Sequence, residues 1–491
     1  MGTFDNGLNL FDPTTESFVR FTHTAQALTK LAGPYVYNIS EDTQGNIWIS
    51  NDGALCLLDF STKTFRRFQQ DLSDPFSLNS NTITDVYFDD NQVMWVSTRF
   101  GGVNVYDPGK YVFRHFTHVS NKANSLSANN IQGMDEDANG NLWIGIDGGG
   151  LNRYDRKTGS FEHFRHDPDN ANSIKNDKIL NVEVDQYGDV WTGMWDGGVT
   201  RYNPTTRKYT RYLHDPTDPN SLSDNNIFDF LIDRDGDLWV ATWGNGINKF
   251  NRETDSFVRY VHDPGNPNSI GKSSVVCLYQ DSQGVLWAGS EDAGLYTFDK
   301  ATGVFTNYQA TGKPGDISSN GIYSVFEDSK GRLWVGTSGA GLNLFDRENQ
   351  SFSVLRESDG LPNDAIVGIL EDGEGNLCLS TNKGLSKFNP ENKAFKNYTE
   401  SDVLQGDQFN RWSFLKLSTG ELAFGGINGF NLFDPKTIKG NSFVPPVYVT
   451  NFKLFNDKVH INEEGPLTQN ILTTSEIILN YSQNFLEFEY T

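Results

Sequence analysis

The sequence has few cysteines, no long apolar run and a shortage of positive charge. Its three cysteines, Cys56, Cys277 and Cys378, are expected to be buried as small apolar residues. Cysteine usage therefore does not indicate in which cellular compartment the protein lies. No apolar stretch approaches the roughly 20 residues of a membrane-spanning helix. Lys and Arg total 40 against 63 Asp and Glu, a formal net charge of −23. This balance argues against nucleic acid and anionic membrane surfaces as partners, because both select basic proteins.

Signatures of catalysis are also missing. The sequence contains no Gly-x-Ser-x-Gly elbow, no phosphate-binding loop and no metalloprotease helix motif. Paired carboxylates are too common in so acidic a chain to indicate a glycosidase. We therefore expect a protein that is not an enzyme, with no catalytic residues and no cofactor.

What the sequence does contain is a repeat, centred on the pattern Asp-x-x-Gly-x-Leu-Trp. The clearest copy has Asp233, Gly236, Leu238 and Trp239 in these places. Its tryptophan slot recurs every 44 to 48 residues, at Trp48, Trp95, Trp143, Trp191, Trp239, Trp287 and Trp334, then as Cys378 and Ala423. A fixed period of this length is the mark of a repeat architecture.

Each repeat is predicted to form four short strands, and helical periodicity of useful length is missing. In the clearest copy the expected strands are Asn226–Ile232, Asp237–Thr242, Gly246–Phe250 and Ser256–His262, separated by residues that favour turns. A four-stranded antiparallel sheet repeated in this way is a β-propeller blade. The fold class is therefore all-β, with Trp, Phe and Tyr buried between adjacent sheets.

The last copy lacks an obvious fourth strand, and Tyr111–His118 is suited to supply it by pairing near Gly429–Phe433. Such pairing closes a ring and removes exposed edges. The prediction is a seven-bladed propeller over residues 111–440, with residues 1–110 as the C-terminal part of a preceding propeller. A single ring of eight or nine blades is the alternative.

The repeat stops after residue 440. Residues 441–491 are expected to be a linker, Phe443–Pro446, and a truncated β-sandwich with strands Val447–Phe455, Glu476–Tyr481 and Asn484–Tyr490. Residues 1–12 align without gaps to the middle of a later blade. We therefore expect a fragment from which an N-terminal part, with any export signal, is missing.

Several of these segments resemble the two-component regulator propeller family. The runs Asn141–Gly145 and Gly148–Asp155, followed by Asp167-Pro168, are similar to its repeat. Phe424–Pro435 is similar to its closing blade, and Ser482–Phe488 to the start of its triple-tyrosine domain, an immunoglobulin-like sandwich.

The resemblance implies a function for the whole chain. Proteins of this family carry two seven-bladed propellers, the sandwich, a membrane helix and usually a histidine kinase, and many are glycan-sensing hybrid regulators of Bacteroidetes. It implies a periplasmic sensor region that contacts the membrane only through a segment missing from this chain. It leaves open a homodimer through the sandwich, and a diguanylate cyclase as the output in place of the kinase.

Two recurring residue types are expected to be structural. The Asp that begins each core turn, as in Asp233, is expected to accept backbone N–H groups of its own turn. Asp233, Asp235 and Asp237 look a little like a calcium loop but lack its spacing and terminal Glu, so we expect no metal site. The histidines at one repeat position are expected to organise loops; they are His118, His166, His214 and His262.

One turn carries large aromatics where other copies have small or polar residues. Trp195 and Trp243 occupy the turn between strands two and three in consecutive blades, and Arg99 and Phe100 occupy it in an earlier copy. Turn tips face water, so a large aromatic side chain there has no core to fill. Arg99 and Phe100 could join a shared site only if the two propellers abut. The alternative is that both tryptophans pack against the neighbouring connector.

The same face of the ring should receive the starts of the innermost strands, including Asn226, Asn410 and Arg411. Aromatic platforms beside amides and charges suit an oligosaccharide, with Arg411 favouring an acidic or sulfated sugar. The sequence thus predicts a ligand-binding sensor. The alternatives are a propeller enzyme that acts on glycans, a lyase or a hydrolase, and a protein–protein scaffold.

Overall fold

The computed structural model describes residues 1–23, 30–72, 76–107, 112–438, 447–462 and 465–490. Contacts group the chain into two units, residues 1–438 and 439–491. Its regular structure is almost entirely β-strand. The helical segments are single 3-10 turns, η1 (Glu357–Asp359), η2 (Glu400–Asp402), η3 (Pro435–Thr437) and η4 (Ile471–Thr473). Among the described residues, none of these helices is long and apolar enough to cross a membrane.

The clearest repeat forms the four-stranded antiparallel sheet that its alternating pattern predicts. Its strands are β19 (Ile227–Ile232), β20 (Leu238–Thr242), β21 (Ile247–Asn251) and β22 (Ser256–Tyr260), each paired with the next. Short turns rich in Gly, Asp and Asn allow consecutive strands to pair in this way. We call this sheet blade 3.

Five further sheets between residues 131 and 398 have the same strand order. Blade 1 has β11 (Ile131–Glu136), β12 (Leu142–Ile146), β13 (Gly150–Asp155) and β14 (Ser160–Phe164). Blade 2 has β15 (Ile179–Val184), β16 (Val190–Met194), β17 (Val199–Asn203) and β18 (Lys208–Tyr212). Blade 4 has β23 (Val275–Gln280), β24 (Leu286–Ser290), β25 (Leu295–Asp299) and β26 (Val304–Tyr308). Blade 5 has β27 (Ile322–Glu327), β28 (Leu333–Thr337), β29 (Leu342–Asp346) and β30 (Ser351–Leu355). Blade 6 has β31 (Ile366–Glu371), β32 (Leu377–Thr381), β33 (Gly384–Asn389) and β34 (Ala394–Tyr398).

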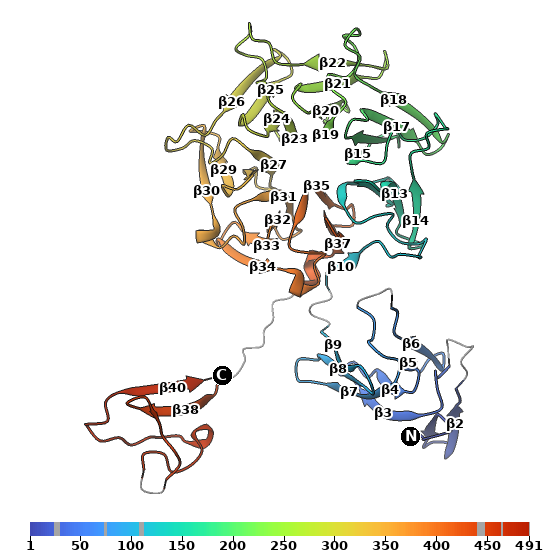
Figure 1. Cartoon of the computed structure of the whole chain (residues 1–491), viewed down its shortest axis with the longest axis vertical. Helices are drawn as coiled ribbons and strands as arrows, with labels where there is room; N and C mark the ends of the chain where they lie inside the picture. Colours follow the sequence, from blue (N-terminus) through green and yellow to red (C-terminus); the bar gives the residue numbers. More distant parts are fainter. Residues whose placement is uncertain (24–29, 73–75, 108–111, 439–446, 463–464, 491) are drawn as a thin grey trace. The chain divides into compact units, whose positions relative to one another are not determined.

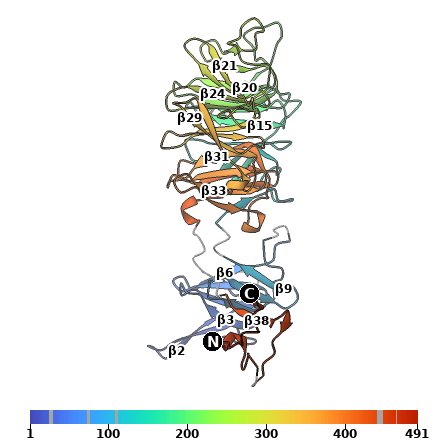
Figure 2. The same cartoon turned by 90° about the vertical axis from the view of Figure 1, so that its left-hand side faces the viewer.

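The seventh sheet joins the two ends of the ring. Blade 7 consists of β35 (Phe409–Lys416), β36 (Leu422–Gly426), β37 (Gly429–Phe433) and, as its outer strand, β10 (Arg114–Phe116). The register places Arg114 opposite Leu432 and Phe116 opposite Phe430. The innermost strand β35 lies beside both β31 and β11, so the seven sheets form a closed ring (Figure 1). Viewed from the side, the ring is flattened (Figure 2). The expected pairing of the 111–118 segment is confirmed for 114–116, and Tyr111 lies outside the described residues.

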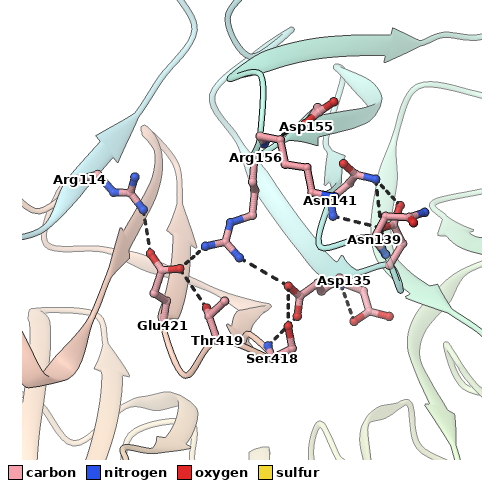
Figure 3. Close-up of polar contacts among 12 residues, drawn as sticks. Arg114, Asp135, Asn139, Asn141, Asp155, Arg156, Ser418, Thr419 and Glu421 are labelled. Carbon is pink, nitrogen blue, oxygen red and sulfur yellow. Dashed lines mark hydrogen bonds and ion pairs between the residues drawn. The ribbon is translucent and has the colours of Figure 1, made fainter.

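Ion pairs reinforce this closure (Figure 3). The Glu421 carboxylate of blade 7 accepts from Arg156 of blade 1 and, at 2.8 Å, from Arg114 of β10. Arg156 also lies 3.5 Å from the Glu136 carboxylate, which accepts the Ser418 backbone N–H at 2.6 Å. One guanidinium therefore links the first and last blades of the ring.

Before the ring, Trp95 in the core slot is 42% exposed, whereas the tryptophans of this slot in blades 1 to 5 are buried between adjacent sheets, as the repeat predicts. Their exposed fractions are 0–3% at the five positions of blades 1 to 5, which are Trp143, Trp191, Trp239, Trp287 and Trp334. Each indole N–H donates to the Asp that begins its own core turn, as Trp239 does to Asp233 at 2.9 Å. The other oxygen of Asp233 accepts the backbone N–H groups of Asp235 and Asp237, which confirms the structural interpretation of this Asp.

The described residues before the ring form three sheets, of two, four and three strands. These are β1 (Leu8–Asp12) with β2 (Ser17–Phe21); β3 (Val36–Glu41), β4 (Ile47–Asn51), β5 (Ala54–Asp59) and β6 (Thr64–Phe68); and β7 (Ile83–Phe88), β8 (Met94–Thr98) and β9 (Gly102–Tyr106). They continue the blade pattern of the repeat, so the all-β propeller fold predicted from the sequence is confirmed.

The second unit contains one three-stranded sheet, of β38 (Val449–Leu454), β39 (Asp457–Lys458) and β40 (Leu486–Tyr490). Two of the three strands expected here are present. The strand expected at Glu476–Tyr481 is wrong, because that segment pairs with no neighbour among the described residues. Its alternating pattern is satisfied by an extended chain without ladder hydrogen bonds. The predicted linker Phe443–Pro446 lies outside the described residues.

Candidate ligand-binding surface

Trp195 and Trp243 lie side by side on one face of the ring. Their ring centroids are 5.8 Å apart, with the planes inclined by 64°. They occupy the β16–β17 and β20–β21 turns of neighbouring blades, and 40% and 43% of their surfaces are exposed. Each therefore presents a large apolar face to solvent, although both also contact Phe228, at 6.1 and 5.2 Å between centroids.

Asn226 fixes the two tryptophan turns. Its backbone carbonyl accepts the N–H of Trp243 at 3.1 Å, and its side-chain oxygen accepts the N–H of Asp196 at 2.8 Å. Its amide group donates to Asp224 at 3.0 Å. Asn226 is thus placed at the predicted site, where its polar atoms hold the turns of blades 2 and 3 together.

Sequence reasoning missed two members of this site, Phe228 and Trp412. Trp412 of β35 stacks on Phe228 of β19 with ring centroids 5.1 Å apart. Its indole N–H donates to the carbonyl of Val276 in β23. We call Trp195, Trp243, Phe228 and Trp412 the aromatic surface.

An insertion in β35 brings Trp412 to this position. Four residues of β35 lie between Phe409 and Phe414, opposite the single residue Gly425 of β36. At the same place β11 has only two residues between Ile131 and Met134. The two additional residues leave the ladder as an enlarged bulge, and Trp412 has a positive φ of 61°, which is uncommon for a bulky residue.

The predicted residues Asn410 and Arg411 belong to the same bulge and reach other blades. The Asn410 amide donates to the side chain of Asn130 at 2.8 Å and to the carbonyl of Ile131 at 2.7 Å, both in blade 1. Arg411 pairs with Glu291 of blade 4 at 2.6 Å and lies over the ring of Tyr323 in blade 5, 3.6 Å from its centroid. The bulge therefore spans the mouth of the ring, with contacts to blades 1, 3, 4 and 5.

Arg99 and Phe100 lie in the β8–β9 turn, in the part of the chain before the ring. The guanidinium of Arg99 is 5.5 Å from the centroid of the Phe100 ring, which is largely exposed. Their role in a ligand site stays a prediction.

The candidate calcium loop is filled by a cation of the protein. Asp233, Asp235 and Asp237 cluster closely, and the Lys300 ammonium of blade 4 lies 2.9 Å from Asp233 and 2.6 Å from Asp235. Burial acts to raise the pKa of Asp233, but hydrogen bonds from Lys300 and Trp239 outweigh it and lower that pKa below its usual value. The cluster is a contact between blades 3 and 4.

Four equivalent histidines organise their loops as expected. The ring Nδ1 of each lies within hydrogen-bond distance of a backbone carbonyl eight residues later, 2.6–3.0 Å away, at His118, His166, His214 and His262.

Three buried carboxylates line the innermost strands. Asp135 accepts the backbone N–H of Val184, and Asp229 accepts that of Leu278, each from the following blade at 2.6 Å. Burial raises the pKa of both to about 7, and it raises that of Glu183 well above the usual value. Raised pKa values of this kind can mark catalytic acids. Here each carboxylate accepts a backbone amide of the next blade, which gives it a structural role.

A cavity of about 980 Å³ lies away from the aromatic surface, between sheets β3–β6 and β7–β9. Trp48, Phe68, Met94 and Val96 are among its lining residues, and the Asp42 at its rim accepts the Trp48 indole N–H at 3.0 Å. The sheet β7–β9 has three strands among the described residues, so the flank between the two sheets is less completely covered.

Comparison with known proteins agrees with this architecture. The two-component regulator propeller family matches residues 30–53, 77–100, 125–148, 221–244, 269–292 and 316–339. Histidine kinase P4 of Formosa agariphila is 29% identical over 127 residues, which are 26% of this chain and 9% of that protein. The matched segment thus spans less than a tenth of that relative's length.

Solved structures share the fold. The extracellular domain of a hybrid two-component system of B. thetaiotaomicron has a TM-score of 0.72 and 24% identity, with coverage of 100% of this chain and 67% of that chain. A second such domain from that organism has a TM-score of 0.55 and 19% identity, covering 100% and 64%. A virginiamycin B lyase from Staphylococcus aureus has a TM-score of 0.50 and 13% identity, covering 65% and 98%. Together with the six matched segments, these findings identify the chain as one built on two-component regulator propeller repeats.

Proposed function

We propose that this chain is the ligand-sensing region of a two-component sensor histidine kinase and that its ring binds an oligosaccharide on the aromatic surface. One observation carries the proposal. Of the ten tryptophans, seven fill the core slot of the repeat. The other three, Trp195, Trp243 and Trp412, converge with Phe228 on one face of the ring.

The chemistry of this surface suits a sugar. The C–H face of a pyranose ring packs on an indole, and nearby amides and carbonyls hydrogen-bond to its hydroxyls. Trp195 and Trp243 stand at turn tips with two fifths of their surface exposed, so they gain only part of their available burial in the free protein. A ligand would bury the remainder.

The position of blade 7 in the chain supports a signalling role. The blade that carries Trp412 also ends the ring, and its last strand β37 stops at Phe433, shortly before the second unit begins. Binding at the aromatic surface would act on this blade and, through residues 441–491 as linker and truncated immunoglobulin-like sandwich, on a kinase outside this sequence. Residues 1–110 are the end of a preceding propeller in this proposal, and the location is periplasmic, with a homodimer through the sandwich.

The alternative of a glycan lyase or hydrolase has less support. The similarity to a lyase is one of fold, at 13% identity. The carboxylates with raised pKa values are buried and accept backbone amides. A non-catalytic sensor, with no cofactor, fits this arrangement best.

Binding measurements test the proposal. The 1–491 chain is applied to a glycan array, and the oligosaccharides retained are titrated by calorimetry against Trp195→Ala and Trp243→Ala. Each substitution should weaken binding at least about tenfold, because truncation of a tryptophan anchor at a binding surface costs on the order of 2 kcal/mol or more. Tyr187→Ala is the control, an exposed aromatic in the β15–β16 turn at the other end of the strands. Lower melting temperatures with unchanged binding would show that the tryptophans only stabilise the fold.

A further inference from the structure

The charges beside the aromatic surface indicate which oligosaccharides it accepts, an inference that rests on the proposed function. Strong recognition of acidic or sulfated sugars is favoured by Arg or Lys side chains that face the ligand and are not already paired with a carboxylate. The sequence suggested Arg411 for this role. In the structure, however, Arg411 forms an ion pair with the carboxylate of Glu291.

Arg411 and Glu291 form a two-pronged ion pair across the ring mouth. The Nη1 atom lies 2.6 Å from one Glu291 oxygen, and Nη2 lies 3.3 Å from the other. Nη2 also donates to the hydroxyl of Tyr323, whose ring lies under the guanidinium. Both charged side chains are about two thirds buried or more, at 26% and 36% exposed. Both terminal nitrogens of the Arg411 guanidinium are thus already engaged by groups of the protein.

The turns around the tryptophans add negative charge. Asp196 directly follows Trp195, and Asp224 accepts hydrogen bonds from Asn226 and Asn245. Among the described residues, neither carboxylate has a Lys or Arg within ion-pair distance.

Other charged groups on this face nearly offset one another. Asp147 and Asp292 lie in the corresponding turns of blades 1 and 4, and the exposed cations on this face include Lys178, Lys272 and Lys383. The chain as a whole carries a net charge of −23, so its long-range field repels anions.

We propose that the aromatic surface takes an uncharged oligosaccharide and that Glu291 excludes uronic-acid and sulfated sugars by occupying Arg411. An anionic group approaching the mouth meets a neutralised guanidinium and nearby carboxylates, so it loses hydration without gaining a partner. A neutral sugar loses less hydration free energy than an anionic one, and it still stacks on the tryptophans. Glu291 is a specificity-determining residue in this arrangement.

The first test compares probes of equal length and different charge. Calorimetry on the 1–491 chain uses a neutral set (cellohexaose, xylohexaose and mannohexaose), hexagalacturonate and a heparin hexasaccharide. We expect at least one neutral probe to bind at least tenfold more tightly than either anionic probe, with little change between 50 and 300 mM NaCl. Tighter binding of an anionic probe, weakened by salt, would overturn this inference and leave the proposed function standing. An absence of binding to all probes would overturn both.

The second test removes the charge of Glu291. Glu291→Gln keeps the side-chain length and an amide oxygen for Arg411, so the ring should melt within a few degrees of the parent chain. Hexagalacturonate should then bind at least tenfold more tightly than to the parent, while binding of the neutral probe changes less than about threefold. Asp292→Asn is the matched control, since its carboxylate accepts from Ser273 and forms no ion pair with an arginine of the described residues. An equal gain in the control would mean that general charge reduction, and not release of Arg411, controls specificity.

Discussion

Trp412 of blade 7 stacks on Phe228 of blade 3, with ring centroids 5.1 Å apart and planes inclined by 24°. The two residues are 184 positions apart in the sequence and belong to blades on different sides of the ring. Leu180 and Val276 pack in the same buried cluster. The bulge in β35 thereby ties the last blade to blades 2, 3 and 4, beside the exposed tryptophans.

Replacement of this indole should affect both binding and stability. Trp412→Ala removes the stack on Phe228 and the hydrogen bond to the Val276 carbonyl, so we expect the melting temperature to fall by several degrees. Oligosaccharide binding should weaken at least about tenfold. Trp412→Phe retains a ring and should fall between the parent and Trp412→Ala in both measurements. If Trp412→Ala matched the parent in both, the bulge would have no part in the surface.

A core tryptophan should behave differently from one on the aromatic surface. Trp239→Ala leaves a cavity between blades 3 and 4 and removes the donor to Asp233, so unfolding in urea should show a loss of about 3–5 kcal/mol. Trp243→Ala, four residues later, should lose less than about 1.5 kcal/mol because that side chain is partly exposed. Comparable losses at the two positions would contradict the division between core and surface tryptophans.

The buried carboxylates should make the ring less stable as pH rises. Burial raises the pKa of Asp229 to about 7 in the folded state, whereas the unfolded chain has an Asp pKa near 3.8. Between these two pH values the folded state therefore keeps a proton that the unfolded chain has lost. This contribution is fully present below about pH 3.8 and is lost as pH rises to about 7. Asp229→Asn should therefore reduce the decrease in melting temperature between pH 5 and pH 8. A decrease equal to that of the parent chain would show that Asp229 is ionised throughout this range.

Ring closure should depend on Glu421. Glu421→Gln leaves Arg114 and Arg156 without their shared carboxylate, so the free energy of unfolding should fall by about 1–3 kcal/mol. Glu162→Gln is the control, because Glu162 faces Arg153 at 3.6 Å on an exposed part of blade 1 and should cost less than about 1 kcal/mol. If the two variants unfold at the same urea concentration, the ion pairs of Glu421 contribute no more to stability than the exposed pair of Glu162.

Much of the fold was readable in the sequence because its signals are local. The tryptophan slot, the Asp six residues before it and the alternation of each strand lie within one repeat, and each repeat folds against neighbours built in the same way. Pairing of β10 with β37 could be anticipated because the last repeat lacked its fourth strand. The segment Glu476–Tyr481 shows the limit of this reasoning, since alternation alone does not supply a pairing partner.

The sequence by itself determined the blades and the placement of Trp195 and Trp243 at the tips of equivalent turns, because both follow from the local repeat pattern. A count of tryptophans outside the core slot would also have singled out Trp412. Only the tertiary structure decided where the bulge of β35 reaches. Its residues contact Phe228, Val276, Glu291 and Tyr323, which lie 88 to 184 positions earlier in the chain. Such contacts depend on closure of the whole ring, because closure brings distant blades to one axis. They therefore cannot be predicted from the pattern of a single repeat.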